Sequence, residues 1–363
     1  MASTHLKRTA LYESHLQAGA KIVPFAGWEM PVSYTSIMEE HKAVRNEAGV
    51  FDISHMGEFF VSGAAAKEAL NVCLTNDVAL LQPGQGQYTL LLNEQGGVID
   101  DLIVYCLEET HYLLVVNASK IEEDFAWLKR HLPNGVLLED RSENYSALAL
   151  QGPQAVEVLK KIFSLKEEAI PARFHLTSIP WKEKTVFVAR TGYTGEDGVE
   201  LFLSRNDGVE IWDLLLKEGV KPVGLGARDS LRLEACYPLN GNDLNETTTP
   251  LEAGLGFAVV LNKADFVGKK VLAEQKEKGV PRKAVAFSVK GKGAPPRSHY
   301  ILRKNHEKVG EVTSGGFSPS LGKGIGMGYV SPEYAKIGTE LVMEVRGQEV
   351  PVVIEKKPLY KKQ

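Results

Sequence analysis

Two aspartates, Asp100 and Asp101, stand side by side at the start of an apolar run in the stretch GGVIDDLIVY, which ends at Tyr105. A carboxylate that enters a β core is costly unless it is paired, hydrogen-bonded or able to take up a proton. Adjacent residues of a strand point to opposite faces, so the two aspartates cannot both face one pocket. If Asp101 shares a face with Ile103, it enters apolar surroundings. The pair either finishes a turn by accepting backbone N–H groups or supplies a carboxylate that orients a ligand or handles a proton.

The strands predicted around this pair carry further polar side chains. Tyr88 lies in QYTLLLN, Tyr105 in VIDDLIVYCL and Asn117 at the end of HYLLVVN, which are three consecutive predicted strands. With Asp100 and Asp101 they form a first candidate cluster. The functional interpretation is a ligand site in a meander, and the alternative is a set of ordinary strand-end polar residues.

A second cluster lies in RTGYTGEDGVEL, which the glycines mark as a hairpin. Glycine allows positive φ angles and close approach of the backbone to a ligand. Tyr193 and Glu200 are far enough apart to face each other across the hairpin or to flank its mouth. A plain hairpin with polar surface residues is the alternative.

A third cluster lies in ARDSLRLEACYPLNGNDL, where Arg228, Arg232 and Glu234 follow one another in a helical run. A guanidinium group offers a planar fork of N–H donors, so Arg232 is a candidate for binding a carboxylate or a polar heterocycle. The alternative is a solvated helix face. His55, within DISHMGEF, is interpreted as a strand-edge histidine with satisfied hydrogen bonds.

The elements that must position these clusters follow from local pattern. Residues 36–48, 64–73 and 121–131 have helical spacing of apolar side chains, and FDISHMGEFFVSG alternates like a strand. YSALALQGPQAVEVLKKIF predicts a strand, a turn and a helix. From about residue 281 the chain turns to short strands with turn signals, which predicts a separate small β domain.

Composition bounds the function. The chain has 363 residues, a 44% apolar fraction and a net charge of −4. These values indicate a soluble protein of two or three domains and give no electrostatic footprint for nucleic-acid binding. Cys73, Cys106 and Cys236 are too scattered for a disulfide framework or a CxxC metal site. No segment has the composition of a membrane span or a leader, so we expect a cytoplasmic protein. Dinucleotide, P-loop, HExxH and GxSxG motifs are absent.

Read together, the motifs resemble the aminomethyltransferase, or T-protein, family of the glycine cleavage system over essentially the whole chain. The stretches that carry the resemblance are KRTALYESHLQAGAKIVPFAGWEMPVSY, FDISHMGE, QYTLLLNEQGGVIDDLIVY, VNASK, LALQGPQA, RTGYTGEDGVEL, LRLEACYPLNGND, AGLGFAV with DFVGKK, and VTSGGFSPSLGKGIGMGYV. Their joint order is highly specific, although a single piece such as GYTGE is less so.

The resemblance implies an α+β fold with mainly antiparallel sheets, in a three-domain cloverleaf around a central folate pocket and with a C-terminal β-barrel-like domain. The implied domains are residues 1–50 with 139–245, residues 51–138 with 246–278, and residues 279–363. It also implies a reaction. The aminomethyl carbon on the lipoyl arm of the partner H-protein passes to tetrahydrofolate, giving 5,10-methylenetetrahydrofolate and ammonia without a metal or a flavin.

The same resemblance assigns residues. Asp101, the second aspartate of the GG-x-x-D-D motif, becomes the catalytic carboxylate. Glu200 is expected to hold the aminopyrimidine part of the pterin through paired hydrogen bonds. The remaining implied folate ligands are Met56, Tyr88, Tyr105, Asn117, Tyr193 and Arg232. The family often has an arginine near its C-terminus where this chain ends LYKKQ, and Lys361 lacks the bidentate fork of arginine.

Two alternatives share this fold. Folate-dependent demethylases carry an additional flavin domain, and we expect none here because the sequence contains no GxGxxG unit. Folate-binding iron–sulfur assembly factors have a KGC-type motif before the C-terminal domain, where this chain reads LNKADFVGKK without cysteine. We also expect docking of the carrier to be electrostatic, with an exposed basic area on this enzyme meeting an acidic carrier.

Overall fold

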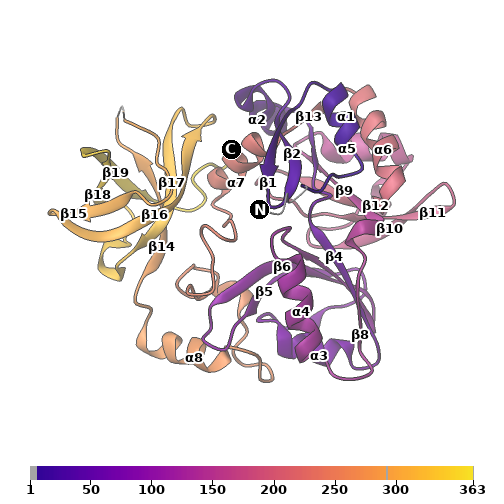
Figure 1. The fold of residues 1–363 in the computed structure, drawn as a ribbon, viewed down its shortest axis with the longest axis horizontal. Helices are drawn as coiled ribbons and strands as arrows, with labels where there is room; N and C mark the ends of the chain where they lie inside the picture. The colour runs from indigo at the N-terminus through magenta and orange to yellow at the C-terminus, as the bar shows by residue number, and fades with distance from the viewer. Residues whose placement is uncertain (1–5, 292, 363) are drawn as a thin grey trace. The chain divides into compact units, whose positions relative to one another are not determined.

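The structure, a computed structural model, describes residues 6–291 and 293–362 and confirms the α+β class with mostly antiparallel sheets (Figure 1). The chain divides into two compact units, each built from several segments. Unit 1 consists of the described residues up to Leu70, of Val78–Tyr88 and of Leu102–Asp229. Unit 2 consists of Asn71–Asp77, Thr89–Asp101 and the described residues from Ser230 on. The finer division into three domains stays a prediction.

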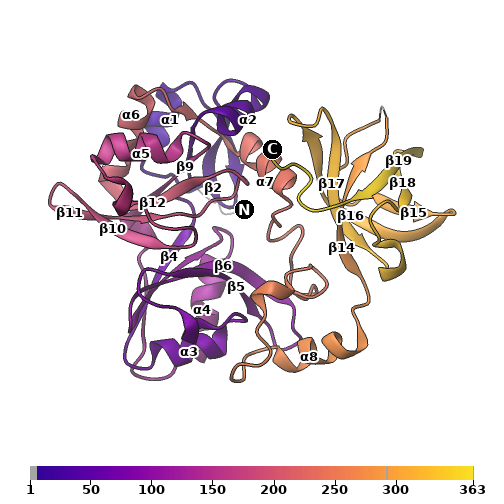
Figure 2. The same ribbon diagram turned by 180° about the vertical axis from the view of Figure 1, so that it is seen from behind.

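Unit 1 contains a six-stranded sheet of order β10-β11-β12-β9-β3-β13, antiparallel except for the β3–β13 pair. Its strands are β3 (Gly49–Asp52), β9 (Tyr145–Gln151), β10 (Leu176–Trp181), β11 (Lys184–Ala189), β12 (Gly198–Ser204) and β13 (Lys221–Pro222). Helices α5 (Ala155–Phe163) and α6 (Arg205–Lys217) lie side by side against this sheet in both views (Figures 1 and 2). The apolar faces of these elements form one core around Trp212.

A five-stranded sheet has the order β5-β6-β7-β4-β8. Its strands are β4 (Gly57–Ser62), β5 (Gly86–Leu92), β6 (Val98–Glu108), β7 (His111–Val116) and β8 (Leu137–Asp140). The helices next to it in the chain are α3 (Ala66–Cys73) and α4 (Ile121–His131), and the bounds of α4 are those that the sequence predicts. The predicted meander of three strands is confirmed in β5, β6 and β7.

One predicted strand is wrong. FDISHMGEFFVSG forms two strands, β3 and β4, which belong to different sheets. The break is a turn in which the N–H of Ser54 donates to Asp52 Oδ1 at 2.9 Å and the N–H of Met56 donates to the Ile53 carbonyl at 3.0 Å. Short polar side chains that bond the local backbone favour such turns, and this one overrides the alternating pattern.

The N-terminal part of unit 1 is anchored by a buried polar network. This N-terminal part comprises α1 (Tyr12–Gln17), the ribbon β1 (Lys21–Phe25) and β2 (Trp28–Ser33), and α2 (Ile37–Asn46). The N-cap of α2 is Ser36, whose hydroxyl accepts from the N–H of Glu39 at 3.2 Å. His15 Nε2 lies 2.8 Å from Asp52 Oδ2, and the Tyr34 hydroxyl lies 2.9 Å from His15 Nδ1. This network ties α1 and the segment after β2 to β3. Helix α7 (Leu225–Ala235) begins in unit 1 and ends in unit 2.

The predicted C-terminal β domain is confirmed as a closed barrel in unit 2, of strand order β14-β17-β16-β15-β18-β19 (Figure 1). Its strands are β14 (Lys283–Val289), β15 (Ile301–Lys304), β16 (Glu307–Ser318), β17 (Lys323–Val330), β18 (Glu340–Val345) and β19 (Gln348–Glu355). Helix α8 (Lys269–Lys278) precedes it. The short 3₁₀ helices are η1 (Val78–Leu80), η2 (Ser142–Asn144), η3 (Glu167–Ala169), η4 (Gly256–Ala258) and η5 (Pro332–Tyr334). Within the described ranges, every helix is too short or too polar to cross a membrane.

Candidate active site

The loop between β11 and β12 carries Tyr193. A buried glutamine of β9, Gln151, forms hydrogen bonds with this loop. Gln151 Nε2 donates to the carbonyls of Thr191 at 3.0 Å and Val199 at 3.3 Å, and its Oε1 accepts from the Thr194 hydroxyl at 2.9 Å. A Cβ at Gly192 would lie 2.0 Å from Gln151 Oε1, so only glycine fits there. The loop therefore has its shape fixed by buried hydrogen bonds before any ligand binds.

Two arginines, Arg190 and Arg45, form hydrogen bonds and ion pairs with residues of the same loop. Arg190 forms a two-pronged ion pair with Asp197, Nε to Oδ1 at 3.1 Å and Nη2 to Oδ2 at 2.7 Å. Arg45 of α2 donates to the carbonyl of Thr194 at 2.7 Å and to Glu196 at 3.0 Å. Paired guanidinium–carboxylate contacts give geometric specificity as well as energy. Tyr193 and Glu200 thus extend from a rigid hairpin rather than from a mobile one.

A hydrogen-bonded chain links Tyr105, Thr191 and Glu200. The Thr191 hydroxyl donates to Glu200 Oε2 at 2.5 Å, and it lies 2.8 Å from the Tyr105 hydroxyl. Because the threonine has one proton and donates it to the carboxylate, the Tyr105 hydroxyl must donate to Thr191. Burial raises the pKa of Tyr105 well above its ordinary value, so this donor stays protonated. Glu200 Oε1 accepts no bond from any residue in the described ranges.

The Tyr105 side chain is completely buried against Gly86 of β5. A Cβ at Gly86 would lie 2.4 Å from Tyr105 Cδ1, so the ring occupies the space that any other residue would need. This close approach fixes the position of the Tyr105 ring, whose hydroxyl begins the chain of hydrogen bonds to Glu200.

Arg228 of α7 adds a positive charge to this cluster. Its guanidinium carbon lies 4.7 Å from the centre of the Tyr193 ring, which is a cation–π distance. Burial raises the pKa of the Glu200 carboxyl, while the bond from Thr191 and the charge of Arg228 act in the opposite direction. An aromatic face, a carboxylate with a free oxygen and a cation therefore occur together in unit 1, and we call Tyr105, Thr191, Tyr193, Glu200 and Arg228 the Glu200 cluster.

The other predicted residues of unit 1 are half-buried. Met56 lies in the turn between β3 and β4, Tyr88 in β5, and Asn117 directly after β7, where its carbonyl accepts from the N–H of Lys120. Their positions leave side-chain surface for a ligand. Their roles as folate ligands stay predictions.

Strand β6 separates its two aspartates as alternation requires. Asp100 is completely buried, whereas Asp101 is half-buried. The alternating pattern predicts apolar surroundings for Asp101, but Asp101 is the more accessible of the two aspartates. Asp100 is the one that the protein encloses. Both aspartates belong to unit 2, and a catalytic role for Asp101 stays a prediction.

Arg232, also in unit 2, has the contacts of a structural ion pair. It is 2% exposed, and its Nη1 donates to Asp243 Oδ2 at 3.0 Å and to the Tyr237 carbonyl at 3.3 Å. Nη2 donates to the Ser314 hydroxyl of β16 at 2.9 Å. Asp243 is further bonded by the hydroxyls of Thr313 and Ser314. A substrate role for Arg232 stays a prediction, and the geometry favours Arg228, which sequence reasoning left as one of a helical set.

Thr191 and Gln151 are the functional residues that sequence reasoning missed. Both lie inside quoted motifs, RTGYTGEDGVEL and LALQGPQA, but neither type is diagnostic of binding. Their importance comes from contacts between β9 and the β11–β12 loop, which no local pattern contains. The one available signal was Gly192. A glycine at such a position indicates that another group approaches the backbone closely, but it does not identify that group.

His55 differs from its predicted role as a histidine with satisfied hydrogen bonds. It is 2% exposed, its ring lies edge-on to Phe25 at 5.7 Å, and its Nδ1 is buried without a hydrogen-bond partner in the described part of the chain. Burial, aided by the charge of Arg228, lowers the pKa of His55 to about 4, while Asp52 acts in the opposite direction. His55 is therefore neutral at pH 7.

This buried imidazole predicts a pH dependence of stability. Between about pH 6.5, where an unfolded histidine titrates, and pH 4, the unfolded state binds more protons than the folded state. The free energy of unfolding should therefore fall as the pH falls through this window, by roughly 3 kcal/mol from His55 alone. Urea unfolding of the wild type and of His55→Gln at pH 7.5 and pH 4 measures it. A stability difference between the two proteins that does not change with pH would contradict the assignment.

Comparisons with known proteins agree with this geometry. The profile described as the GCVT N-terminal domain matches residues 11–263, and that of the glycine cleavage T-protein C-terminal barrel domain matches residues 282–361. The aminomethyltransferase of Halothermothrix orenii is 47% identical over 357 residues, which cover 97% of this chain and 99% of the relative. That of Geobacillus sp. (strain WCH70) is 47% identical over 362 residues, which cover 98% and 99%.

A solved structure gives the same answer for the fold. The crystal structure of glycine cleavage system aminomethyltransferase T from Bartonella henselae matches this chain with a TM-score of 0.92 and 39% identity, covering 98% of both chains. Neither the demethylase nor the iron–sulfur alternative is favoured by these relatives. The chain belongs to the aminomethyltransferase, or T-protein, family of the glycine cleavage system.

Proposed function

We propose that this aminomethyltransferase moves the aminomethyl carbon from the lipoyl arm of a partner H-protein to tetrahydrofolate. The carbon–sulfur and carbon–amine bonds of the donor break, and the same carbon forms bonds to N5 and N10 of the folate. The two protons lost from these nitrogens end on the departing amine, which leaves as ammonia, and on the lipoyl sulfur, which leaves as a thiol. No oxidation or reduction is involved.

The Glu200 cluster is the observation that carries this proposal. A pterin has an aminopyrimidine edge with two adjacent N–H donors and a flat aromatic face. Glu200 Oε1 has no partner in the described residues, and its carboxylate can accept both donors of such an edge. The charge of Arg228 and the Thr191 bond support the ionised form that this acceptor role needs.

The surrounding residues complete the proposed folate site. Arg228 is proposed as a folate ligand beside the predicted Arg232, because its guanidinium stacks on Tyr193 and is part of the cluster. Tyr193 offers a ring for the pterin, and Met56, Tyr88 and Asn117 are proposed to line the same ligand. Tyr105 acts through Thr191 and is a positioning residue. Lys361 is exposed, and we assign it no clamping role.

Asp101 is the proposed catalytic carboxylate. Transfer requires the carbon to be held between a departing amine and a folate nitrogen, so positioning supplies much of the acceleration. A half-buried carboxylate at those nitrogens stabilises the cationic, iminium-like carbon, orients the nucleophile and relays a proton.

An anaerobic assay tests the function itself. The protein is mixed with tetrahydrofolate and the aminomethylated lipoyl carrier, and ammonia and methylenetetrahydrofolate are measured against the carrier's spontaneous loss of ammonia. We expect both products to form in equal amounts and only with all components present. If the protein bound folate but released no ammonia above the spontaneous rate, it would be a folate-binding protein and the transferase proposal would be wrong.

A further inference from the structure

The turn between α4 and β8 contains an asparagine followed by a glycine, Asn134–Gly135, and both residues are exposed. The N–H of Val136 donates to the carbonyl of Pro133 at 3.2 Å and closes the turn, in which Gly135 has a φ of +91°. The side-chain amide of an asparagine is an electrophile at Cγ, and the backbone nitrogen of the next residue can attack it to close a five-membered ring. Glycine presents that nitrogen without a Cβ that would crowd it.

Neither reacting group of this turn forms a hydrogen bond. The Asn134 side-chain amide and the N–H of Gly135 have no hydrogen-bond partner within residues 6–291 and 293–362. A backbone N–H that is hydrogen-bonded must break that bond before its nitrogen can lose the proton and attack. Since the groups of Asn134 and Gly135 are both unbonded and exposed, this barrier is absent here, and water can reach the product of the attack.

The sequence has a second Asn–Gly pair, Asn240–Gly241 in unit 2, and its groups are bonded. Asn240 Nδ2 donates to the Ile99 carbonyl at 3.2 Å, and the N–H of Gly241 donates to the Leu244 carbonyl at 2.8 Å. The electrophile and the nucleophile of this pair are therefore both held. The same dipeptide thus occurs in two environments that differ in tertiary structure.

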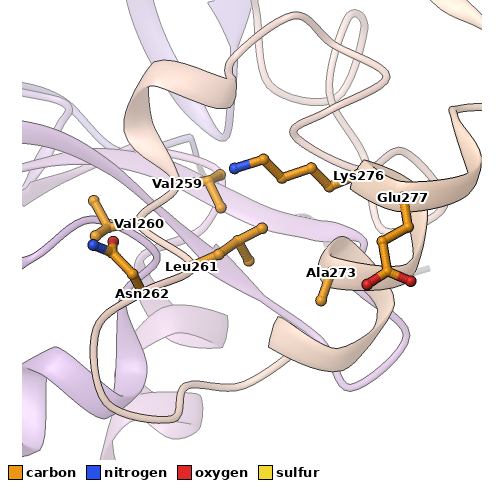
Figure 3. Close-up of a pocket in the computed structure, with 7 residues that line it drawn as sticks. All are labelled: Val259, Val260, Leu261, Asn262, Ala273, Lys276 and Glu277. Atoms are coloured by element: carbon orange, nitrogen blue, oxygen red, sulfur yellow. The ribbon is translucent and has the colours of Figure 1, made fainter.

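An exposed asparagine without a following glycine gives a third environment. Asn262 lines the groove between the segment 259–262 and α8, where Figure 3 shows its side chain. The next residue is Lys263, whose Nζ donates to the carbonyls of Asn71 at 2.6 Å and Asn76 at 2.8 Å. The Cβ of Lys263 crowds the backbone nitrogen, and its anchored side chain keeps this residue from reorienting. Exposure of the asparagine alone therefore does not make a reactive site.

We propose that Asn134 is a site of spontaneous deamidation, which converts it to isoaspartate and aspartate. The Gly135 nitrogen bonds to Cγ of Asn134, the bond from Cγ to Nδ2 breaks, and the departing amine takes the proton of the Gly135 N–H and leaves as ammonia. Water then opens the succinimide ring. Addition at the backbone carbonyl gives isoaspartate, and addition at Cγ gives aspartate. One water is consumed, one ammonia is released, and nothing is oxidised or reduced.

Isoaspartate lengthens the main chain by one carbon inside the turn that leads into β8. This turn packs closely on the residue after β4, since a Cβ at Gly63 would lie 2.6 Å from the carbonyl oxygen of Gly135. Pairing of β8 with β4 begins at Leu137, opposite Ser62. β8 is an edge strand of its sheet, so it is held on one side only. We therefore expect the modification to loosen β8.

Peptide mapping measures the reaction. The folded protein, and the protein unfolded in guanidinium chloride, are incubated in mildly alkaline buffer, which favours loss of the proton from the attacking nitrogen. Trypsin then releases residues 131–141 with Asn134, and residues 233–263 with Asn240 and Asn262. Mass spectrometry follows the conversion of amide to acid, and synthetic peptides identify the isoaspartyl form by its retention time.

In the folded protein we expect Asn134 to be converted at least about tenfold faster than Asn240 and Asn262. In the unfolded protein Asn134 and Asn240 should react at similar rates, and Asn262 should stay slow. Equal rates for the two Asn–Gly pairs in the folded protein, or folding that slows Asn134 about tenfold or more, would overturn the assignment. A slow Asn240 in the unfolded protein would overturn its protection by the fold.

Two variants separate the lengthened chain from the new charge. Asn134→Gln moves the amide one carbon further away, so the five-membered ring cannot form and the variant should stay unmodified. Asn134→Asp adds the charge without lengthening the chain, and it should melt close to unmodified wild type. Converted wild type should melt about 2 °C or more below the unmodified protein. An unchanged melting temperature after full conversion, or an equal loss in Asn134→Asp, would reject the effect on β8.

Discussion

Asp101→Asn should lower turnover by about 10²–10⁴-fold while tetrahydrofolate still binds. The amide keeps the shape of the carboxylate but loses the negative charge that stabilises the cationic carbon and the capacity to accept a proton. Because Asp101 is half-buried, the variant should fold normally. Steady-state rates of methylenetetrahydrofolate formation, with folate affinity from fluorescence or calorimetry, measure both quantities.

The neighbouring aspartate is the matched control. Asp100 is completely buried on the opposite face of β6, so Asp100→Asn should lower the melting temperature and leave the turnover of the folded protein close to wild type. If Asp101→Asn turned over near the wild-type rate with folate bound, the catalytic assignment would be wrong. If Asp100→Asn were the inactive but stable variant, the roles of the two aspartates would be exchanged.

Arg232→Met should lower the free energy of unfolding by about 3–5 kcal/mol, because it leaves the Asp243 carboxylate buried without its ion-pair partner. The side chains of both partners are 3% exposed, so water cannot replace the lost contact. Urea unfolding followed by circular dichroism gives the change directly. The double variant Arg232→Met with Asp243→Asn should recover part of the loss, since it removes the uncompensated charge.

Arg228→Met on the same helix should show the opposite profile. Arg228 is half-buried and its guanidinium stacks on Tyr193, so the stability loss should be smaller than that of Arg232→Met. Tetrahydrofolate should bind at least about tenfold more weakly, because a positive charge that lowers the pKa of Glu200 is gone and the carboxyl is ionised less. Normal folate affinity in Arg228→Met, or a fully stable Arg232→Met that has lost folate, would favour Arg232 as the ligand over Arg228.

Much of the local structure could be predicted from the sequence. The helix at 121–131, the strands β5, β6 and β7 and the C-terminal β domain all follow from short-range periodicity and turn chemistry. The opposite environments of Asp100 and Asp101 also follow, because side chains alternate along any strand. Which face is the enclosed one does not follow, since it depends on the elements packed on each side.

The division of FDISHMGEFFVSG into β3 and β4 marks the limit of this reasoning. Alternation over residues 51–63 is compatible with one strand, and only the pairing of each half with a different sheet reveals the turn. Likewise His55 looks like an ordinary polar residue of a strand. Its pKa of about 4 arises from burial and from Arg228, which is far away in the sequence.

The family was legible in the order of the motifs, because motif spacing survives in the linear chain. The reaction and the candidate site residues that the resemblance names stay predictions. The contact partners of those residues were not legible in the sequence. Arg228 and Arg232 lie on one helix and have the same chemistry, yet one stacks on a hairpin tyrosine and the other is buried against the barrel residue Ser314. Thr191 connects Tyr105 to Glu200 only because β6 and the β11–β12 hairpin meet in the fold. Such choices depend on contacts between residues tens to hundreds of positions apart, and local propensity carries no information about them.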